Sequence, residues 1–198
     1  MGILKDGTGA RLSDRGAARP PCRPPTVIDD AILSWTWAYW DRLRADRPMP
    51  LPAAIDPLDI RPDVLPQMML TDVLEGARRF RFRLFGTGLA DAAGFDQTGL
   101  HLDELRVTED YRAYLIGLFN DVCGQALPLF TVSDFLRDER YTMATKRLML
   151  PLSDDGAAVD RVLTVQTFFD PTHMLDHRKP GERLDFSRFA EKTRCFIQ

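Results

Sequence analysis

RFRFRLFG, at residues 79–86, alternates basic and apolar side chains over its first six positions. A period of two indicates a strand with one face on a core and the other toward solvent. We therefore expect a strand here whose Phe80, Phe82 and Leu84 point to the core. The arginines between them would lie on the other face, where their stems cover apolar surface while the guanidinium groups reach acids or water.

The segments on either side of this strand give the order of the remaining elements. Residues 68–74 predict a strand ahead of it, and residues 86–107, rich in glycine and aspartate, predict tight turns around short helices. Thr108 is then the expected N-cap of an amphipathic helix that starts at Glu109, and Gly124 is expected to end that helix. Three further strands follow, and the short turns between them favour antiparallel pairing: residues 128–136, 141–152 and 159–169.

This order predicts an α+β fold. Five antiparallel strands form one sheet, helices inserted between the second and third strands cover one of its faces, and an N-terminal helix over residues 28–44 precedes it. The apolar residues of that helix form two adjacent stripes, which together exceed the roughly 100° that one packing surface needs. The second stripe faces either a second copy of the chain, which would make Leu33, Trp37 and Trp40 a homodimer interface, or a loop or tail of the same chain.

The chain divides into four parts. Residues 1–26 form a basic arm rich in proline and arginine, with a net charge of +3 and few large apolar residues, so we expect a flexible tail. Residues 27–66 hold the N-terminal helix and a strap that its prolines make extended and stiff. Residues 67–170 form the main domain. Residues 171–198 form a tail with a short helix that begins at Asp185 and docks through phenylalanines.

Composition and charge are those of an ordinary soluble domain. The 198 residues are 44% hydrophobic and 28% charged, with a formal net charge of −3, so we expect no attraction to nucleic acid. The dispersed charges of the arm are typical of a solvated segment. The N-terminus has no signal-peptide core, no stretch is apolar enough to span a membrane, and three cysteines at no metal-ligand spacing indicate reduced thiols. We expect a cytoplasmic protein without membrane contact.

Six segments carry a resemblance to a known family: YWDRLRADRPMP (39–50), IDPLDI (55–60), LPQMMLTDVL (65–74), FRFRLFGTGL (80–89), DQTGLHLDEL (96–105) and LPLSDDGAAVDRVL (150–163). In this order, and with the helical insert between strands, the chain resembles small bacterial PAS-like proteins of the alphaproteobacterial type, which consist of one such domain and little else. The resemblance implies a sensory or regulatory role in signal transduction. It brings no catalytic residue.

The resemblance also implies a pocket, because PAS-like domains enclose one between the inner face of the sheet and the inserted helices. Small ligands, haem or flavin can bind there. We expect its walls to include six side chains of the predicted strands and helix: Phe82, Leu84, Tyr114, Leu118, Leu148 and Val165. Alternatively, the same residues fill a solid core, as apolar residues do in most domains.

No cofactor is evident from the residues. Haem needs an axial ligand, and His101 is the histidine of the main domain that could supply it. Cys123 lies near the end of a helix, whereas a photoreactive flavin site would need a cysteine ahead of that helix. His173 and His177 have a helical spacing, but no third ligand accompanies them, so we expect no zinc or other metal site.

We expect a non-catalytic sensory module rather than an enzyme. The sequence has no GxSxG, HExxH or Walker motif, and no kinase, cyclase or helix-turn-helix segment. Binding of a small ligand or a protein partner would shift the packing of the N-terminal helix, through the strand that carries Arg81 and Arg83, and would change association or dimerisation. Two alternatives remain: a protein-interaction adaptor with a filled core, and a small cone-shaped α+β enzyme with a buried carboxylate of raised pKa.

Overall fold

Six strands form one antiparallel sheet in the computed structural model, which describes residues 28–136, 142–169 and 189–197. The strand order across the sheet is β2-β1-β5-β4-β3-β6, and every neighbouring pair is antiparallel. The strands are β1 (Met68–Leu74), β2 (Arg79–Phe85), β3 (Leu129–Leu136), β4 (Thr142–Leu152), β5 (Arg161–Phe169) and β6 (Phe189–Phe196).

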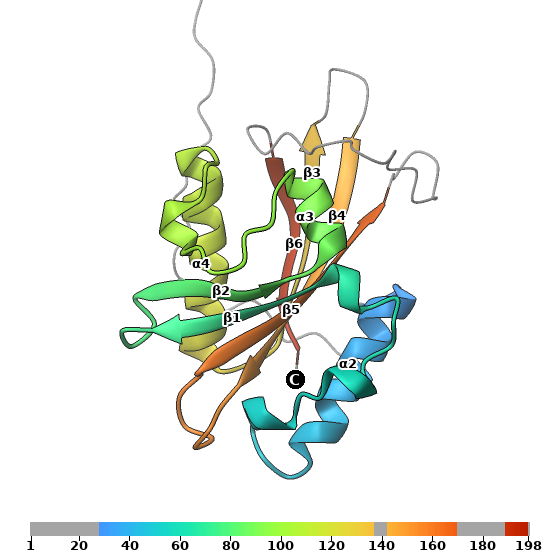
Figure 1. Cartoon of the computed structure of the whole chain (residues 1–198), viewed down its shortest axis with the longest axis vertical. Coiled ribbons are helices and arrows are strands. Elements are labelled where there is room, and N and C mark those ends of the chain that lie inside the picture. Colours follow the sequence, from blue (N-terminus) through green and yellow to red (C-terminus); the bar gives the residue numbers. More distant parts are fainter. Residues whose placement is uncertain (1–27, 137–141, 170–188, 198) are drawn as a thin grey trace, which may run out of the picture.

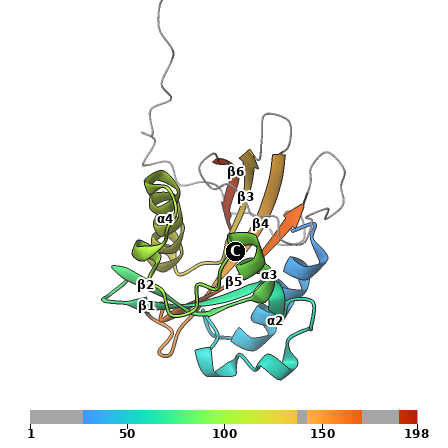
Figure 2. The same ribbon diagram turned by 45° about the horizontal axis from the view of Figure 1, so that its top comes forward.

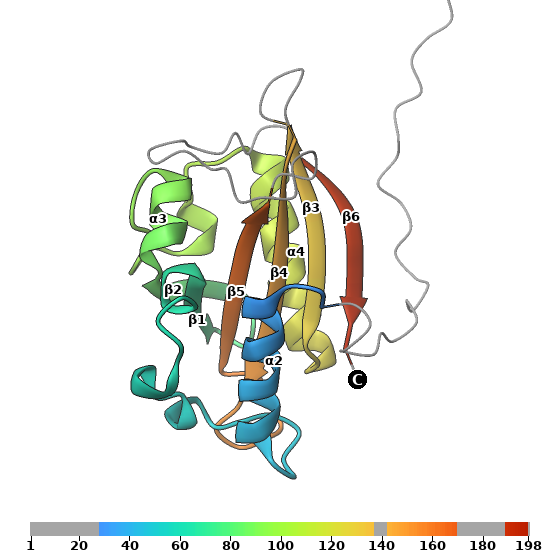
Figure 3. The same cartoon turned by 90° about the vertical axis from the view of Figure 1, so that its right-hand side faces the viewer.

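Helices lie on both faces of this sheet. α2 (Ala31–Arg44) packs on one face, against β4 and β5 (Figure 1). The other face, which we call the inner face, is covered by α3 (Thr87–Ala93), the 3₁₀ turn η4 (Leu102–Glu104) and α4 (Glu109–Gln125), as Figure 3 shows. The α+β fold, with helices inserted between β2 and β3 and a helix ahead of the sheet, is therefore confirmed.

Side-chain contacts identify which strand residues point toward α2. The amine of Lys146 on β4 pairs with Asp29, and the hydroxyl of Thr167 on β5 donates to Asp30 at 2.9 Å. Lys146 and Thr167 are cross-strand partners, so they mark the α2 face. Because successive strand residues point to opposite faces, the adjacent cross-strand pair, Arg147 and Gln166, points to the inner face.

The start of α2 is fixed by Asp30. Its carboxylate accepts hydrogen bonds from the backbone N–H groups of Ile32 and Leu33, at 2.9 and 3.0 Å, in a side-chain N-cap. Further along the helix, the indole of Trp40 donates to the carbonyl of Pro151 at 2.9 Å. The Trp40 bond and the bond from Thr167 to Asp30 hold both ends of α2 against the β4–β5 pair.

The proline-rich strap covers the other side of α2. Three 3₁₀ turns link the helix to β1 (Figure 2), and the third of them packs against α3 and β5. The hydroxyl of Tyr39 accepts from the N–H of Asp56 at 3.2 Å, and the guanidinium of Arg61 lies 5.9 Å from the centre of the Trp35 ring. The bounds of the turns are η1 (Pro52–Ala54), η2 (Pro57–Asp59) and η3 (Leu65–Gln67).

The wide apolar surface of α2 is thus covered within one chain, by the sheet and the strap. The side chains of Leu33 and Trp40 are 0% and 2% exposed. The assignment of these two residues to a homodimer interface was therefore wrong, because both side chains belong to the core of one chain. Trp37 is half-buried and lines an open hollow of the surface, so a dimer contact through it stays a prediction.

The C-terminal residues differ from the expectation. The sequence predicted five strands and a helix from Asp185, but Phe189–Phe196 form a sixth strand, β6, at the edge beside β3. Residues 170–188 lie outside the described part of the chain. The backbone groups of the β3 edge give this segment ladder partners, and such tertiary pairing outweighs a weak local preference for helix.

The cysteines also differ from the expectation of three reduced thiols. Cys195 on β6 is disulfide-bonded, whereas Cys123 on α4 is free. The cysteine pattern therefore no longer supports a reducing location. None of the helices in the described ranges has the length and apolarity that a membrane crossing requires.

Candidate functional site

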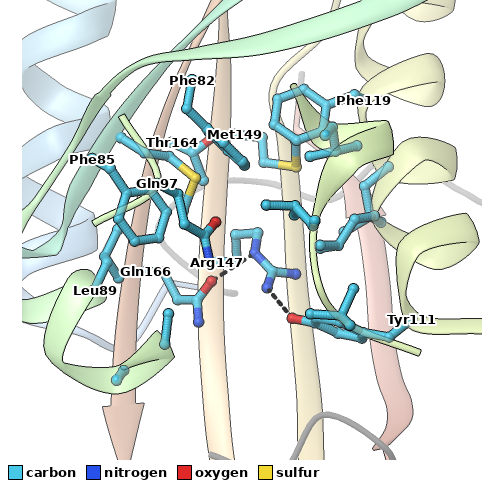
Figure 4. Close-up of a pocket in the computed structure, with 18 of the residues that line it drawn as sticks. Phe82, Phe85, Leu89, Gln97, Tyr111, Phe119, Arg147, Met149, Thr164 and Gln166 are labelled. Carbon is cyan, nitrogen blue, oxygen red and sulfur yellow. Dashed lines mark hydrogen bonds between the residues drawn. The ribbon is translucent and has the colours of Figure 1, made fainter. Parts of the chain in front are cut away.

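A cavity of about 60 Å³ lies between the inner face of the sheet and the covering helices (Figure 4). Its volume is several times the roughly 10–15 Å³ that one water needs, so it can hold several waters or a small molecule. β2 supplies Phe82 and Phe85, α3 supplies Leu89, and α4 supplies Leu118 and Phe119. The walls are therefore mostly apolar.

The floor of the cavity carries a charged side chain. Arg147 on β4 is 3% exposed, and its Nε donates to Oε1 of Gln166, its cross-strand partner on β5, at 2.9 Å. Its Nη2 donates to the hydroxyl of Tyr111 on α4 at 3.4 Å. Figure 4 shows Arg147 between these two partners, with the amide of Gln97 extending toward the same space. Arg147 thereby connects the sheet to the helix that covers it.

Several buried polar atoms of this face have no hydrogen-bond partner within the described residues. They include Nη1 of Arg147 and the hydroxyls of Thr131 and Thr164. Thr131 is the partner of Arg147 on β3, and Thr164 lines the cavity. An unsatisfied buried polar group costs about 1–3 kcal/mol, and a charged one costs more. The inner face thus holds donors that no described residue uses.

Within the described residues, no acidic neighbour neutralises the charge of Arg147. Both side chains that it contacts, Gln166 and Tyr111, are neutral groups. Burial raises the pKa of the Tyr111 phenol, against the smaller opposing effect of Arg147, so the phenol stays protonated at neutral pH. Among the described residues that line the cavity there is no carboxylate. A buried cation in this setting favours the entry of an anion.

Comparison with known proteins identifies the architecture around this cavity. A family model described as PAS domain matches residues 31–166, which is more than half of the chain. The chain belongs to the PAS domain family. No curated protein and no solved structure matches it.

The match places the cavity inside a PAS domain. It begins with the first residue of α2 and ends at Gln166 on the cavity floor. PAS domains are generally non-catalytic modules with sensory or regulatory roles, so the coarse role expected from the sequence is supported. The six segments that resembled small PAS-like proteins all lie within the matched range.

Two of the six predicted pocket residues line the cavity of this PAS domain. Phe82 and Leu118 lie in its walls. Tyr114 instead sits beside it, where its hydroxyl is 2.8 Å from the hydroxyl of Ser133 on β3 and its ring lies 6.0 Å from that of Tyr111. Tyr114 therefore packs against Tyr111, the residue whose hydroxyl contacts Arg147.

Leu84 was wrongly placed because β2 contains an irregularity. Leu70 of β1 pairs with Leu84, but the next residue, Thr71, pairs with Phe82, so Arg83 is an extra residue in β2. Such a bulge reverses the facing of the residues beyond it. As a result Phe85 lines the cavity, and Leu84 is 38% exposed.

Leu148 and Val165 were wrongly placed because they point to the other face. They are partners in the β4–β5 ladder, in phase with the Lys146–Thr167 pair that contacts the start of α2. Both are fully buried there. Both strands are largely buried on both faces, and in such strands the sequence pattern does not distinguish the faces.

The sequence analysis missed Arg147, Gln166 and Thr164. The available signal was that long polar side chains occur among the apolar residues of both strands, TMATKRLMLPL and RVLTVQTFF. A charged residue is almost never fully buried unless it has a partner or a function. Strand pairing was needed to show that these polar residues meet.

The alternative sites do not fit this geometry. His101 caps η4, where its Nδ1 lies 3.3 Å from a carboxylate oxygen of Glu104, and it does not line the cavity, so it cannot serve as the ligand of a haem bound there. Burial raises the pKa of the Cys123 thiol to about 11, which leaves it unreactive at neutral pH. His173 and His177 lie outside the described residues, among which no group of three potential metal ligands occurs.

Proposed function

We propose that this PAS domain is a sensory module that binds a small molecule in the inner-face cavity and reports its occupancy through the packing of α2. The observation that supports this most strongly is the buried Arg147, whose Nη1 has no partner among the described residues and which lines a cavity with room for a ligand. A filled core would leave no such space and would satisfy its polar groups. The binding event requires no catalytic group.

The β4–β5 pair offers the path from the cavity to α2. Arg147 and Gln166 form one rung of this ladder on the inner face, and Lys146 and Thr167 form the adjacent rung on the α2 face. Thr167 in turn donates to Asp30, the N-cap of α2. A ligand that moves Arg147 therefore shifts strand segments that hold the first turn of the helix.

This path replaces the one expected from the sequence. The expectation assigned the signal to the strand that carries Arg81 and Arg83. In the structure Arg81 pairs with Asp72 on β1 at 2.7 Å, Arg83 approaches the same carboxylate at 3.7 Å, and α2 packs on β4 and β5. Arg81 and Arg83 thus stabilise the β1–β2 pair, and a protein partner would detect the change in the packing of α2.

Methyl NMR of the methionines tests the binding step. Met69 and Met149 line the cavity, whereas Met68 pairs with Val165 on the α2 side of the sheet. Titration with a panel of small metabolites is expected to shift the Met69 and Met149 methyl signals more than that of Met68. If no member of the panel shifts these two signals, the cavity is not a binding site and the adaptor alternative is favoured.

A pair of substitutions on α3 sharpens this test. Ala92→Leu adds a side chain to the cavity wall, and Ala90→Leu makes the same change on the same helix outside the lining. We expect Ala92→Leu to abolish the ligand-induced shifts and Ala90→Leu to retain them. If overpacking unfolds the first variant, Ala93→Leu fills the same cavity from a half-buried position. Shifts that persist in a folded, filled variant would contradict the proposal.

Tryptophan fluorescence tests the coupling step. The chain has three tryptophans, Trp35, Trp37 and Trp40, and all of them lie on α2. A ligand in the cavity contacts none of them, so a change in emission on binding reports altered packing of α2. We expect such a change in the wild type and a smaller one in Thr167→Val, which loses the bond to Asp30. Binding without any emission change would refute the coupling.

A further inference from the structure

Arg147 indicates which class of molecule the cavity takes. It is the only charged side chain among the described residues that line the cavity, and it is almost completely buried. Salt bridges elsewhere in the described ranges pair arginines with acids, as Arg81 and Arg161 pair with Asp72. Among the described residues, Arg147 instead forms its side-chain hydrogen bonds with the neutral groups of Gln166 and Tyr111. Within the described ranges, the charge of Arg147 is therefore buried in the cavity without a counter-charge.

We infer that the cavity binds a small monocarboxylate, whose carboxylate pairs with the guanidinium of Arg147. This inference rests on the proposed function and gives its ligand a chemical class. An ionised carboxylate accepts hydrogen bonds only, and the unused groups here include a guanidinium N–H and the Thr164 hydroxyl, which can both donate. Pairing with an arginine gives short, charge-assisted hydrogen bonds.

The charge count selects a monoanion. A single buried cation neutralises one negative charge, so a phosphate or a dicarboxylate would bring a second charge into apolar walls without compensation. The remaining lining is made largely of leucine, phenylalanine, alanine and methionine side chains. A ligand that fits has one carboxylate at the Arg147 end and a short apolar body.

The size of the cavity limits that body. A volume of about 60 Å³ is smaller than the engineered cavity of about 150 Å³ that accepts benzene in another protein. Short aliphatic acids match this space better than aromatic or long-chain acids do. Butyrate is therefore a suitable probe, and butyramide is its neutral counterpart with nearly the same shape.

The test compares these two probes on the full chain. Titrations followed by the Met69 and Met149 methyl signals give both affinities, and we expect butyrate to bind at least about tenfold more tightly than butyramide. Inorganic phosphate is expected to bind more weakly than butyrate. Equal binding of butyrate and butyramide to the wild type would overturn the inference, and this comparison needs no variant.

Two neighbouring basic residues provide matched variants. Arg147→Met removes the charge in the cavity, and Lys146→Met removes the same charge from the next residue, which points to the α2 face. We expect Arg147→Met to lose the preference for butyrate over butyramide and Lys146→Met to keep it. Arg147→Lys is expected to retain part of the preference, because it keeps the charge without the planar fork. A folded Arg147→Met variant with unchanged butyrate affinity would overturn the inference.

The outcomes separate this inference from the function on which it rests. If neutral molecules shift the cavity methyl signals and butyrate does not, the cavity binds ligands but the carboxylate assignment fails. If no member of the panel, charged or neutral, shifts them, the proposed function and the inference both fail. Binding of butyrate that depends on Arg147 but leaves tryptophan emission unchanged supports the inference and contradicts only the coupling.

Discussion

The two faces of the same strands are built differently. On the α2 face Leu33, Leu148 and Leu150 are fully buried, and polar groups there have partners, such as Thr167 with Asp30. On the inner face, β4 and β5 border a cavity and leave Arg147 Nη1 and the Thr164 hydroxyl unpaired within the described residues. One face thus contributes stability and holds α2, while the other keeps binding groups available. The alternation of side chains along a strand makes this division possible.

The largest expected effect is a core truncation on the α2 face. Leu148→Ala removes a fully buried side chain from close packing and should lower the free energy of unfolding by about 3–5 kcal/mol. Leu118→Ala, equally buried but next to the existing cavity, should cost about 2–3 kcal/mol, since part of its surroundings is already empty. Urea unfolding measures both. A larger loss for Leu118→Ala would contradict the contrast between the two faces.

The next effect concerns the start of α2. Asp30→Ala removes the N-cap and the acceptor of the Thr167 hydroxyl, and we expect a loss of about 2 kcal/mol. Asp29→Ala, at the preceding exposed position, should cost at most about 1 kcal/mol because it removes only a surface ion pair. Equal losses in thermal or urea unfolding would mean that the cap does not anchor the helix.

The strands and helices could be predicted from the sequence because local patterns determine them. The alternation in residues 79–86 and the apolar runs of β4 and β5 gave strand bounds within two residues of the observed ones. The long helix begins at Glu109 as expected, although the Thr108 hydroxyl makes no capping bond. It ends at Gln125 rather than at Gly124, and the residue that caps it, Ala126, is left-handed with φ of 51°.

The site could not be predicted because it depends on pairing. The bulge at Arg83 is a property of the β1–β2 register, and it exchanges Leu84 for Phe85 in the cavity wall. Leu148 and Arg147 are adjacent on β4 and point to opposite faces of the sheet. The face that borders the cavity is known only once the helices that cover each face are known. The order of elements supported a pocket in general, but only the ladder partners show which polar groups meet in it.

A third, smaller contrast comes from two threonines on β5. Thr167→Val removes a hydroxyl that is bonded to Asp30 and should cost about 1 kcal/mol. Thr164→Val makes the same change on the inner face, where the hydroxyl has no partner among the described residues, and should leave stability unchanged or raise it by up to about 1 kcal/mol. Chemical denaturation of both variants tests this. A clear loss for Thr164→Val would mean that its hydroxyl is bonded in solution.

The smallest expected effect is the pH dependence of the Lys146–Asp29 pair. The hydrogen bond from Lys146 lowers the pKa of the Asp29 carboxyl from its usual 3.8, although partial burial opposes the shift. The ionised carboxylate therefore stabilises the folded state above the unfolded pKa, and this contribution disappears as the pH falls through the folded pKa. The Asp29 side chain is 75% exposed, so water screening limits the contribution to about 0.2–1 kcal/mol.

Comparison of wild type with Asp29→Asn tests this sign. Urea unfolding should show the wild type to be more stable at neutral pH, with a difference that shrinks in high salt and vanishes in strong acid. A difference that persists in acid would show that the amide disturbs the contact by shape rather than by charge. Lys146 and Arg147 are adjacent on β4, yet within the described ranges Lys146 has an exposed acid beside it and Arg147 has none. That difference predicts a small, salt-sensitive effect on stability for the Lys146–Asp29 pair. For Arg147 it predicts an effect that depends on bound ligand.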